Sequence, residues 1–223
     1  LVFRAAEAFF STTSIAPGVR IILEKKIPVA AGLGGGSSDA AAVLLGLNRL
    51  YAAEMEPEGL ADIGLKLGAD VPFFLQDCSG ALATGIGESL RQVDPIRNYW
   101  ILLVNPGFAV STKWAYENFP LTSYSNPFIL ARGRKMDGNF MLSSPGLFEE
   151  LGNDLEAVTI NRYPEIGYIK KELKKAGAVT ALMSGSGPTV FGLFPGKKEA
   201  QHGFEQFARE YGDNVFLVRP YIP

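Results

Sequence analysis

The stretch Pro28–Leu45, PVAAGLGGGSSDAAAVLL, joins a glycine-rich loop to an alanine-rich segment. Glycine occupies positions 32, 34, 35 and 36, and two serines follow directly. Because alanine and leucine favour helix, the sequence predicts a helix here, with Ser37, Ser38 or Asp39 available as its N-cap. The preceding segment, GVRIILEKKIPVA, is rich in β-branched residues and predicts a strand that leads into the loop.

The spacing of the glycine loop excludes two familiar nucleotide motifs. A dinucleotide fingerprint fails, because the sixth position counted from Gly32 is Ser37 and no strand with an acidic end follows at the usual distance. A classical P-loop fails, because no Gly-Lys-Ser/Thr sequence occurs. Two interpretations remain: a cradle in which backbone amides and the helix dipole hold a phosphate, or a tight strand-to-helix turn. Four glycines in five positions, followed by two hydroxyls, favour the cradle.

The rest of the chain mixes helices and strands without regular alternation. Helices are predicted over 1–10, 58–67 with a glycine cap at Gly68, two within 153–177, and 197–212. Strands are predicted at 99–107, 178–184, 189–194 and 214–222, with strands and turns over 68–90 and an irregular, mobile loop between Phe119 and Ser144. This pattern favours an α+β fold over a doubly wound sheet.

Composition and charge describe an ordinary globular protein of 223 residues with 47% hydrophobic residues. The formal net charge of −2 argues against sequence-independent nucleic-acid binding, and no apolar run is long enough to cross a bilayer. The single cysteine, Cys78, is expected to be a small buried residue and indicates a reducing compartment. With no signal peptide, the cytoplasm is expected, or the plastid stroma in a plant, and His202 is expected on the surface. Since Leu1 opens inside a helical pattern, we expect the chain to be truncated at its N-terminus.

Three segments together resemble the motifs of the GHMP small-molecule kinases. PVAAGLGGGSSDAAA resembles the second motif, LGADVPFF the catalytic-aspartate segment, and LMSGSGPTVFGLF the third motif. The triple glycine before SSDAAA, together with GADVPFF, differs from the mevalonate, homoserine and galactose kinases, whose loops usually read nearer GLGSSAA. It resembles the branch of the family that acts on a cytidyl-linked alcohol. The resemblance spans the whole chain.

The resemblance implies a fold, a reaction and a cofactor. Residues 1–97 are expected to be the remainder of an N-terminal ATP-binding domain similar to domain 2 of ribosomal protein S5. Residues 98–223 are expected to form a ferredoxin-like C-terminal domain. The implied reaction transfers a phosphoryl group from ATP, with Mg²⁺, to the hydroxyl of a small molecule. A monomer or homodimer is expected.

The resemblance also implies roles for particular residues. The ATP-binding positions are Pro28, Ala30, Gly32, Leu33, Gly34, Gly35, Gly36, Ser37 and Ser38, and Ser38 is also the candidate ligand for magnesium. The substrate-binding positions are Tyr116, Ser184, Gly185, Ser186 and Gly187, with Trp114 as an alternative aromatic for stacking on cytosine. Asp70 matches the catalytic base, although from the residues alone it reads as an aspartate that caps a turn in an apolar setting. Asn153 and Asp154 resemble a helix start with a capping role and an indirect role in the site.

One part of the family pattern has no counterpart in this sequence. The first motif, an N-terminal strand that carries an essential lysine, is absent, and neither Lys25 nor Lys26 occupies its position. Without that cation the chain is expected to be either a fragment of an active kinase or an inactive nucleotide-binding module. We favour the fragment. A related kinase that acts on homoserine or a mevalonate-type alcohol is the other alternative.

Overall fold

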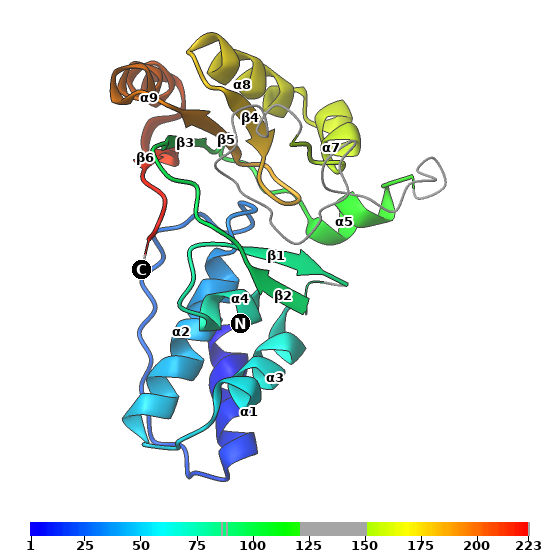
Figure 1. Cartoon of the computed structure of the whole chain (residues 1–223). Helices are drawn as coiled ribbons and strands as arrows, with labels where there is room; N and C mark the ends of the chain where they lie inside the picture. The colour runs from blue at the N-terminus through cyan, green and yellow to red at the C-terminus, as the bar shows by residue number, and fades with distance from the viewer. Residues whose placement is uncertain (86, 88, 121–150, 223) are drawn as a thin grey trace. The chain divides into compact units, whose positions relative to one another are not determined.

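The computed structural model describes residues 1–85, 87, 89–120 and 151–222, and these residues form two compact units (Figure 1). One unit contains Leu1–Ile27 and Gly34–Val93, and the other contains Pro28–Leu33 and Asp94–Ile222. The glycine loop is therefore divided between them, since the chain passes from one unit to the other between Leu33 and Gly34. The domain boundary predicted between residues 97 and 98 remains a prediction.

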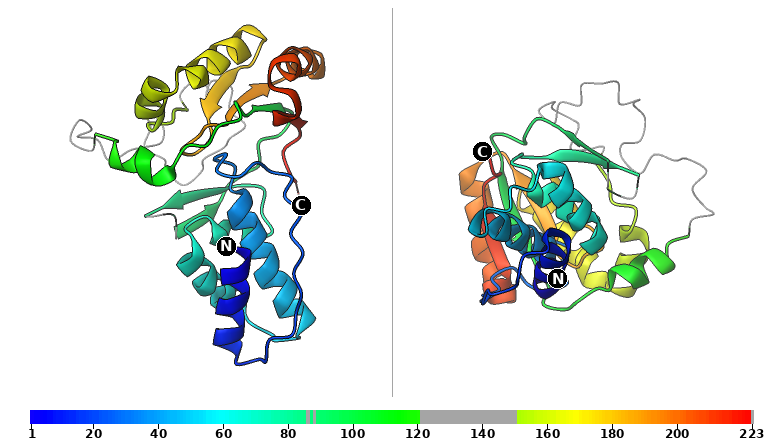
Figure 2. Two further views of the ribbon diagram at one scale, coloured as in Figure 1. Left: turned by 180° about the vertical axis from the view of Figure 1, so that it is seen from behind. Right: turned by 90° about the horizontal axis from the view of Figure 1, so that it is seen from below.

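The first unit is built mainly of helices. Its elements are α1 (Val2–Thr13), α2 (Gly35–Leu50), α3 (Pro57–Leu67), α4 (Val71–Leu75) and a hairpin of antiparallel strands, β1 (Ala81–Thr84) and β2 (Ser89–Gln92). Helices α1 and α2 lie side by side (Figure 2). They bury Phe9 and Leu44 together with Val71 at the start of α4, so the apolar faces of three helices share one core.

The predicted strand over 18–30 is wrong. Residues 14–27 have no regular secondary structure and run as an extended trace beside α2 (Figure 2). Ile22 and Val29 are 80% and 78% exposed, respectively. A strand requires hydrogen bonds to a neighbouring strand, and none of the described residues supplies a partner here. The β-branched composition therefore identified an extended backbone but not a sheet.

Two further expectations about the first unit need correction. Helix α2 begins at Gly35 with Gly34 as its N-cap, so Ser37, Ser38 and Asp39 lie inside the helix. Glycine reaches the left-handed conformation of Gly34 (φ 65°) without strain, which lets the helix start earlier than the serines indicate. Within 68–90, Val71–Leu75 forms the helix α4, because Pro72 is tolerated in the first turn of a helix.

The second unit is a four-stranded antiparallel sheet with helices on one face. Its strands are β3 (Trp100–Val104), β4 (Thr180–Met183), β5 (Val190–Phe194) and β6 (Val215–Val218), in the spatial order β4-β5-β3-β6. Its helices are α5 (Thr112–Glu117), α7 (Glu156–Arg162), α8 (Pro164–Lys175) and α9 (Lys197–Tyr211), followed by a 3₁₀ turn over Gly212–Asn214. With α8 before β4 and α9 before β6, the unit has the βαββαβ order of a ferredoxin-like fold. The α+β class is confirmed.

The core of the second unit lies between the sheet and the helices α8 and α9, which cover the same face (Figure 1). On α8 the fully buried residues Ile166, Ile169 and Leu173 recur at helical spacing. On β3 the fully buried Leu102 and Val104 alternate with half-buried neighbours, as expected for a strand with one covered face.

Three smaller expectations have different outcomes. His202 is exposed, as predicted, whereas Cys78 is only half-buried, with its Sγ 4.0 Å from Oε1 of Gln76. The predicted mobile loop between Phe119 and Ser144 lies almost entirely outside the described residues. Among the helices that the structure describes, none has both the length and the apolar character needed to span a membrane.

Candidate nucleotide- and substrate-binding site

The first turn of α2 presents backbone N–H groups that have no partner within the helix. Gly34, as the N-cap, carries no side chain that could accept a hydrogen bond from them. The first intrahelical bond runs from the N–H of Ser38 to the carbonyl of Gly34 at 2.9 Å. The N–H groups of Gly35, Gly36 and Ser37 therefore remain available, and no acidic side chain occupies this turn. Together with the positive end of the helix dipole, they form a site suited to an anion.

Two polar side chains near this turn could take part in binding a phosphate and a metal ion, those of Ser38 and Lys25. The hydroxyl of Ser38 donates to the carbonyl of Gly35 at 2.9 Å, so its proton is engaged while its oxygen lone pairs remain available. Lys25 lies close to the same turn and forms an ion pair with Asp39 at 2.5 Å, with side chains 28% and 22% exposed. No local sequence pattern predicts this pair, because the two residues are 14 positions apart.

The first part of the glycine loop is fixed to the third-motif segment within the second unit. The hydroxyl of Ser184 donates to the carbonyl of Gly32 at 2.8 Å, and the N–H of Thr189 donates to the carbonyl of Ala31 at 3.3 Å. Gly32 has φ 74°, and a Cβ atom there would lie 2.1 Å from the carbonyl oxygen of Ser184. Only glycine allows this approach, so at this position the structure itself demands the residue.

The third-motif segment between β4 and β5 is a tight loop with its serine hydroxyls engaged. The N–H of Gly187 donates to the carbonyl of Ser184 at 2.9 Å, which closes the turn. The hydroxyls of Ser186 and Thr112, at the start of α5, are hydrogen-bonded at 2.8 Å. Asn105, after β3, donates to the buried hydroxyl of Thr189 at 2.9 Å. Neither Thr112 nor Asn105 was predicted, because both contacts join segments more than 70 residues apart.

Asn153 and Glu156 support the same loop from the start of α7. The side-chain amide of Asn153 donates to the carbonyls of Met183 and Gly185 at 2.8 and 2.7 Å, and its Oδ1 accepts from the N–H of Leu155. Oε1 of Glu156 accepts from the N–H of Met183 at 2.7 Å, while its Oε2 pairs with Lys170. The capping role expected for Asn153 and Asp154 is wrong, because Leu155 is the N-cap residue of α7 and no side chain caps that helix. Asn153 instead supports the third motif.

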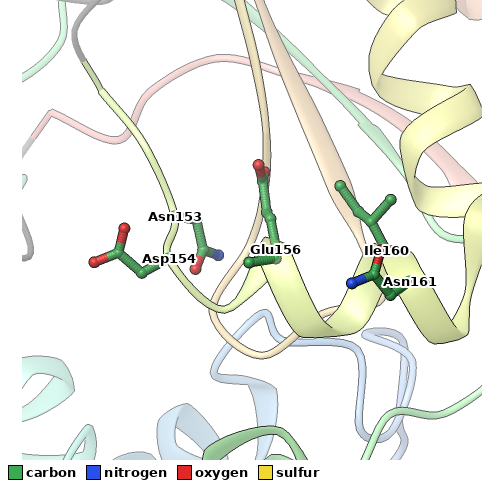
Figure 3. Close-up of a pocket in the computed structure, with 6 residues that line it drawn as sticks. Asn153, Asp154, Glu156, Ile160 and Asn161 are labelled. Carbon is green, nitrogen blue, oxygen red and sulfur yellow. The ribbon is translucent and has the colours of Figure 1, made fainter. Parts of the chain in front are cut away.

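A hollow on the surface of the second unit includes Asn153 and Glu156 in its lining. Its lining residues are Asn153, Asp154, Glu156, Ala157, Ile160 and Asn161 (Figure 3). The carboxylate of Asp154 points away from the side chains of Asn153 and Glu156, so it takes no part in their contacts with the loop (Figure 3).

Asp70, the predicted base, is the N-cap residue of α4 in the first unit. Its side chain makes no capping hydrogen bond, so the interpretation as a capping aspartate is wrong in that respect. The expected apolar setting is present only in its neighbours: Val71 and Pro72 are buried, whereas Asp70 is exposed. An exposed carboxylate without a structural hydrogen bond is available to a ligand.

The two candidate stacking residues on α5 have different surroundings. Trp114 packs edge-on against Tyr163 with 5.9 Å between ring centroids, and Arg162 lies 5.5 Å from its ring centroid. Tyr116 is 63% exposed. Tyr116 is the more exposed of the two, since Trp114 is half-buried, and this favours Tyr116 as the partner of a base.

The predicted site residues thus fall into two groups. Gly34, Gly35, Gly36, Ser37, Ser38 and Asp70 belong to the first unit, and Pro28, Ala30, Gly32, Leu33, Tyr116 and Ser184–Gly187 belong to the second. In the part of the chain that the structure describes, no three His, Cys, Asp or Glu side chains gather in a way that could hold a metal ion.

Comparison with known proteins identifies the class. The description "GHMP kinases N terminal domain" matches residues 1–77, and "GHMP kinases C terminal" matches residues 137–214. A 4-diphosphocytidyl-2-C-methyl-D-erythritol kinase from Syntrophotalea carbinolica is 47% identical over 217 residues, which are 97% of this chain and 75% of that protein. The protein of the same name from Geobacter metallireducens is 48% identical over 222 residues, 100% of this chain and 76% of that protein. The chain belongs to the GHMP kinase family.

The structural comparison points to the same member of the family. A crystal structure of 4-(cytidine 5'-diphospho)-2C-methyl-D-erythritol kinase superposes with a TM-score of 0.76 at 33% sequence identity. The match covers 97% of this chain and 76% of that one. The resemblance inferred from the three motifs is therefore confirmed.

Proposed function

We propose that the chain carries out ATP-dependent phosphorylation of the 2-hydroxyl of 4-diphosphocytidyl-2-C-methyl-D-erythritol, in the non-mevalonate pathway to isoprenoid precursors. The observation that carries the proposal is the first turn of α2, with free amides at Gly35, Gly36 and Ser37. This turn occurs in a chain whose relatives bear the name of that kinase. The reaction belongs in the bacterial cytoplasm, with the enzyme as a monomer or homodimer.

ATP is the phosphoryl donor, and its phosphates are placed at the first turn of α2. Gly32 and Leu33 continue the loop on the side that Ser184 and Thr189 hold in place. Pro28 and Ala30 precede it, and Ala30 has a positive φ of 54°. A backbone cradle of this kind holds phosphate without a Walker lysine, because its donors are main-chain amides.

Ser38 has the donor chemistry that magnesium requires. Mg²⁺ prefers hard oxygen ligands and is usually bound through few protein groups together with the substrate phosphates. The Ser38 oxygen retains its lone pairs, since its proton is donated to Gly35. When bound, the ion neutralises charge on the ATP phosphates.

Asp70 is proposed as the base that accepts the proton of the substrate hydroxyl. As the new oxygen–phosphorus bond forms, the bond between the γ-phosphorus and ADP breaks, and the hydroxyl proton passes to the carboxylate. The exposure of Asp70 and its lack of a capping bond support this role, because a structural carboxylate would be engaged.

The second unit is proposed to bind the acceptor. The loop Ser184–Gly187 faces its phosphates, and the exposed ring of Tyr116 stacks on cytosine. The hydrogen bond between Ser186 and Thr112 fixes the start of α5, the helix that carries Tyr116, to this loop.

A substrate panel tests the proposal. The enzyme is incubated with ATP, Mg²⁺ and the cytidyl substrate, homoserine or mevalonate, and phosphomonoester products are measured by ³¹P NMR. We expect a new monoester only with the cytidyl substrate. Turnover of homoserine or mevalonate instead would assign another kinase specificity, and ATP binding without any product would refute kinase activity in this chain.

A further inference from the structure

The side-chain amide of Asn153 grips two carbonyl groups on either side of Ser184. Both hydrogens of the amide are used, on Met183 at 2.8 Å and on Gly185 at 2.7 Å, and its oxygen is held by the N–H of Leu155 at 3.0 Å. An amide bound at all three positions cannot rotate without breaking several hydrogen bonds. Asn153 therefore holds the backbone of the third-motif loop in one position.

These bonds determine where the N–H groups of the same peptides point. In a planar trans peptide the C=O and the following N–H point in opposite directions. The Met183–Ser184 peptide illustrates this: its carbonyl meets Asn153, and the N–H of Ser184 donates to the carbonyl of Thr189 at 2.8 Å. The Gly185–Ser186 peptide is also trans, so its N–H points away from Asn153.

The N–H of Ser186 differs from that of Ser184 in having no acceptor among the described residues. Ser186 is only 8% exposed, and its hydroxyl is engaged with Thr112. A buried backbone N–H without an acceptor lowers the stability of the fold. Folded proteins keep such a group where a ligand or a water molecule accepts its hydrogen bond. Gly185, with φ 56°, gives the loop the turn that this orientation requires.

We propose that Asn153 is a positioning residue that holds the Gly185–Ser186 peptide so that the N–H of Ser186 donates to a phosphoryl oxygen of a bound ligand. The inference rests on the proposed function, because it requires a phosphorylated ligand in this loop. The diphosphate of the cytidyl substrate and the phosphates of ATP share this chemistry. Glu156 assists by accepting from the N–H of Met183, the residue whose carbonyl also accepts from Asn153.

The test combines two variants with a matched control. Asn153→Ala removes both donors, and Asn153→Asp keeps the shape but cannot donate to either carbonyl. Asn161→Ala is the control, because Asn161 lies on α7, the helix that follows Asn153, and lines the same hollow (Figure 3) but makes no hydrogen bond among the described residues. Affinities for CDP, cytidine, ADP and adenosine are measured by calorimetry. The Ser186 amide is followed in ¹H–¹⁵N spectra during each titration.

In the parent protein, the Ser186 amide proton should shift downfield with a phosphorylated ligand and not with its nucleoside. Both Asn153 variants should lower the affinity for that phosphorylated ligand by about 10-fold or more, leave the affinity for the nucleoside unchanged and abolish the shift of the Ser186 amide proton. A loss of affinity confined to CDP would identify the diphosphate of the acceptor as the group that the Ser186 N–H binds. A loss of affinity confined to ADP would identify the phosphates of the nucleotide instead. An unmoved Ser186 amide in the parent, or equal losses for nucleoside and diphosphate, would overturn the inference. If the parent turns over substrate and only the Asn153 result fails, the proposed function still stands.

Discussion

Replacing Gly32 by alanine tests whether the glycine loop depends on its close approach to the third motif. The new Cβ would lie 2.1 Å from the carbonyl oxygen of Ser184 and 3.0 Å from that of Gly187. Both neighbours are backbone atoms of a hydrogen-bonded turn, so neither yields as a flexible side chain would. The loop must move, which stretches the bond from Ser184 to the Gly32 carbonyl.

The magnitude follows from three contributions. A non-glycine residue in the left-handed conformation costs about 1–2 kcal/mol. Overpacking of a rigid site costs about 1–3 kcal/mol, and the strained hydrogen bond contributes about 1 kcal/mol. Alanine recovers up to about 1 kcal/mol by restricting the unfolded chain. We therefore expect Gly32→Ala to lower the free energy of unfolding by about 2–5 kcal/mol.

Gly46→Ala is the matched control, because it makes the same chemical change inside α2, where a Cβ meets nothing within 4 Å. This variant should gain about 0.5–1 kcal/mol from helix propensity. Urea unfolding followed by circular dichroism should show a midpoint about 1 M or more lower for Gly32→Ala and slightly higher for Gly46→Ala. Equal stability of Gly32→Ala and the parent would refute the close approach of the two loops.

Further predictions concern the base, the cradle, the aromatic ring and a half-buried tyrosine. Asp70→Asn should lower kcat by at least about 100-fold while ATP affinity stays nearly constant; near-normal turnover would remove it from the base role. Gly36→Pro removes one free amide in the first turn of α2, at a position where a helix tolerates proline. The affinity for ATP should therefore be about 10-fold lower in Gly36→Pro than in Gly36→Ala, while both variants show equal helix content by circular dichroism. Tyr116→Ala should raise KM for the cytidyl substrate by about 5- to 100-fold and leave KM for ATP unchanged, whereas an effect on ATP alone would contradict cytosine stacking. Burial, followed by its hydrogen bond to Glu165, raises the pKa of Tyr211 well above its ordinary value of 10.0. The phenol thus stabilises the fold fully below pH 10 and progressively less above it, so urea midpoints should fall more steeply above pH 10 in the parent than in Tyr211→Phe.

Local patterns predicted most elements of the second unit. Helix α8 shows apolar residues at helical spacing, with Pro164 in its first turn, so its start and its buried face can both be read from the sequence. Strands β4 and β5 flank a glycine-containing turn, which is typical of a hairpin. In these segments the residue pattern and the tertiary structure agree.

The segment 18–30 shows where sequence patterns are insufficient. β-branched residues favour an extended backbone, but a strand also needs a hydrogen-bonding neighbour, and the sequence does not show whether one is present. The N-cap of α2 was misplaced for a related reason. Serine is a common cap, but the left-handed conformation of Gly34 decides the start of the helix.

The family can be recognised from the glycine loop, the aspartate segment and the third motif alone, because each of these short motifs consists of neighbouring residues. The hydrogen bonds that hold the third motif, in contrast, are visible only in the folded chain. Asn153 meets Gly185 across 32 residues, and Ser184 meets Gly32 across 152. Such bonds depend on the fold bringing distant backbone groups within about 3 Å, and no local pattern encodes that distance.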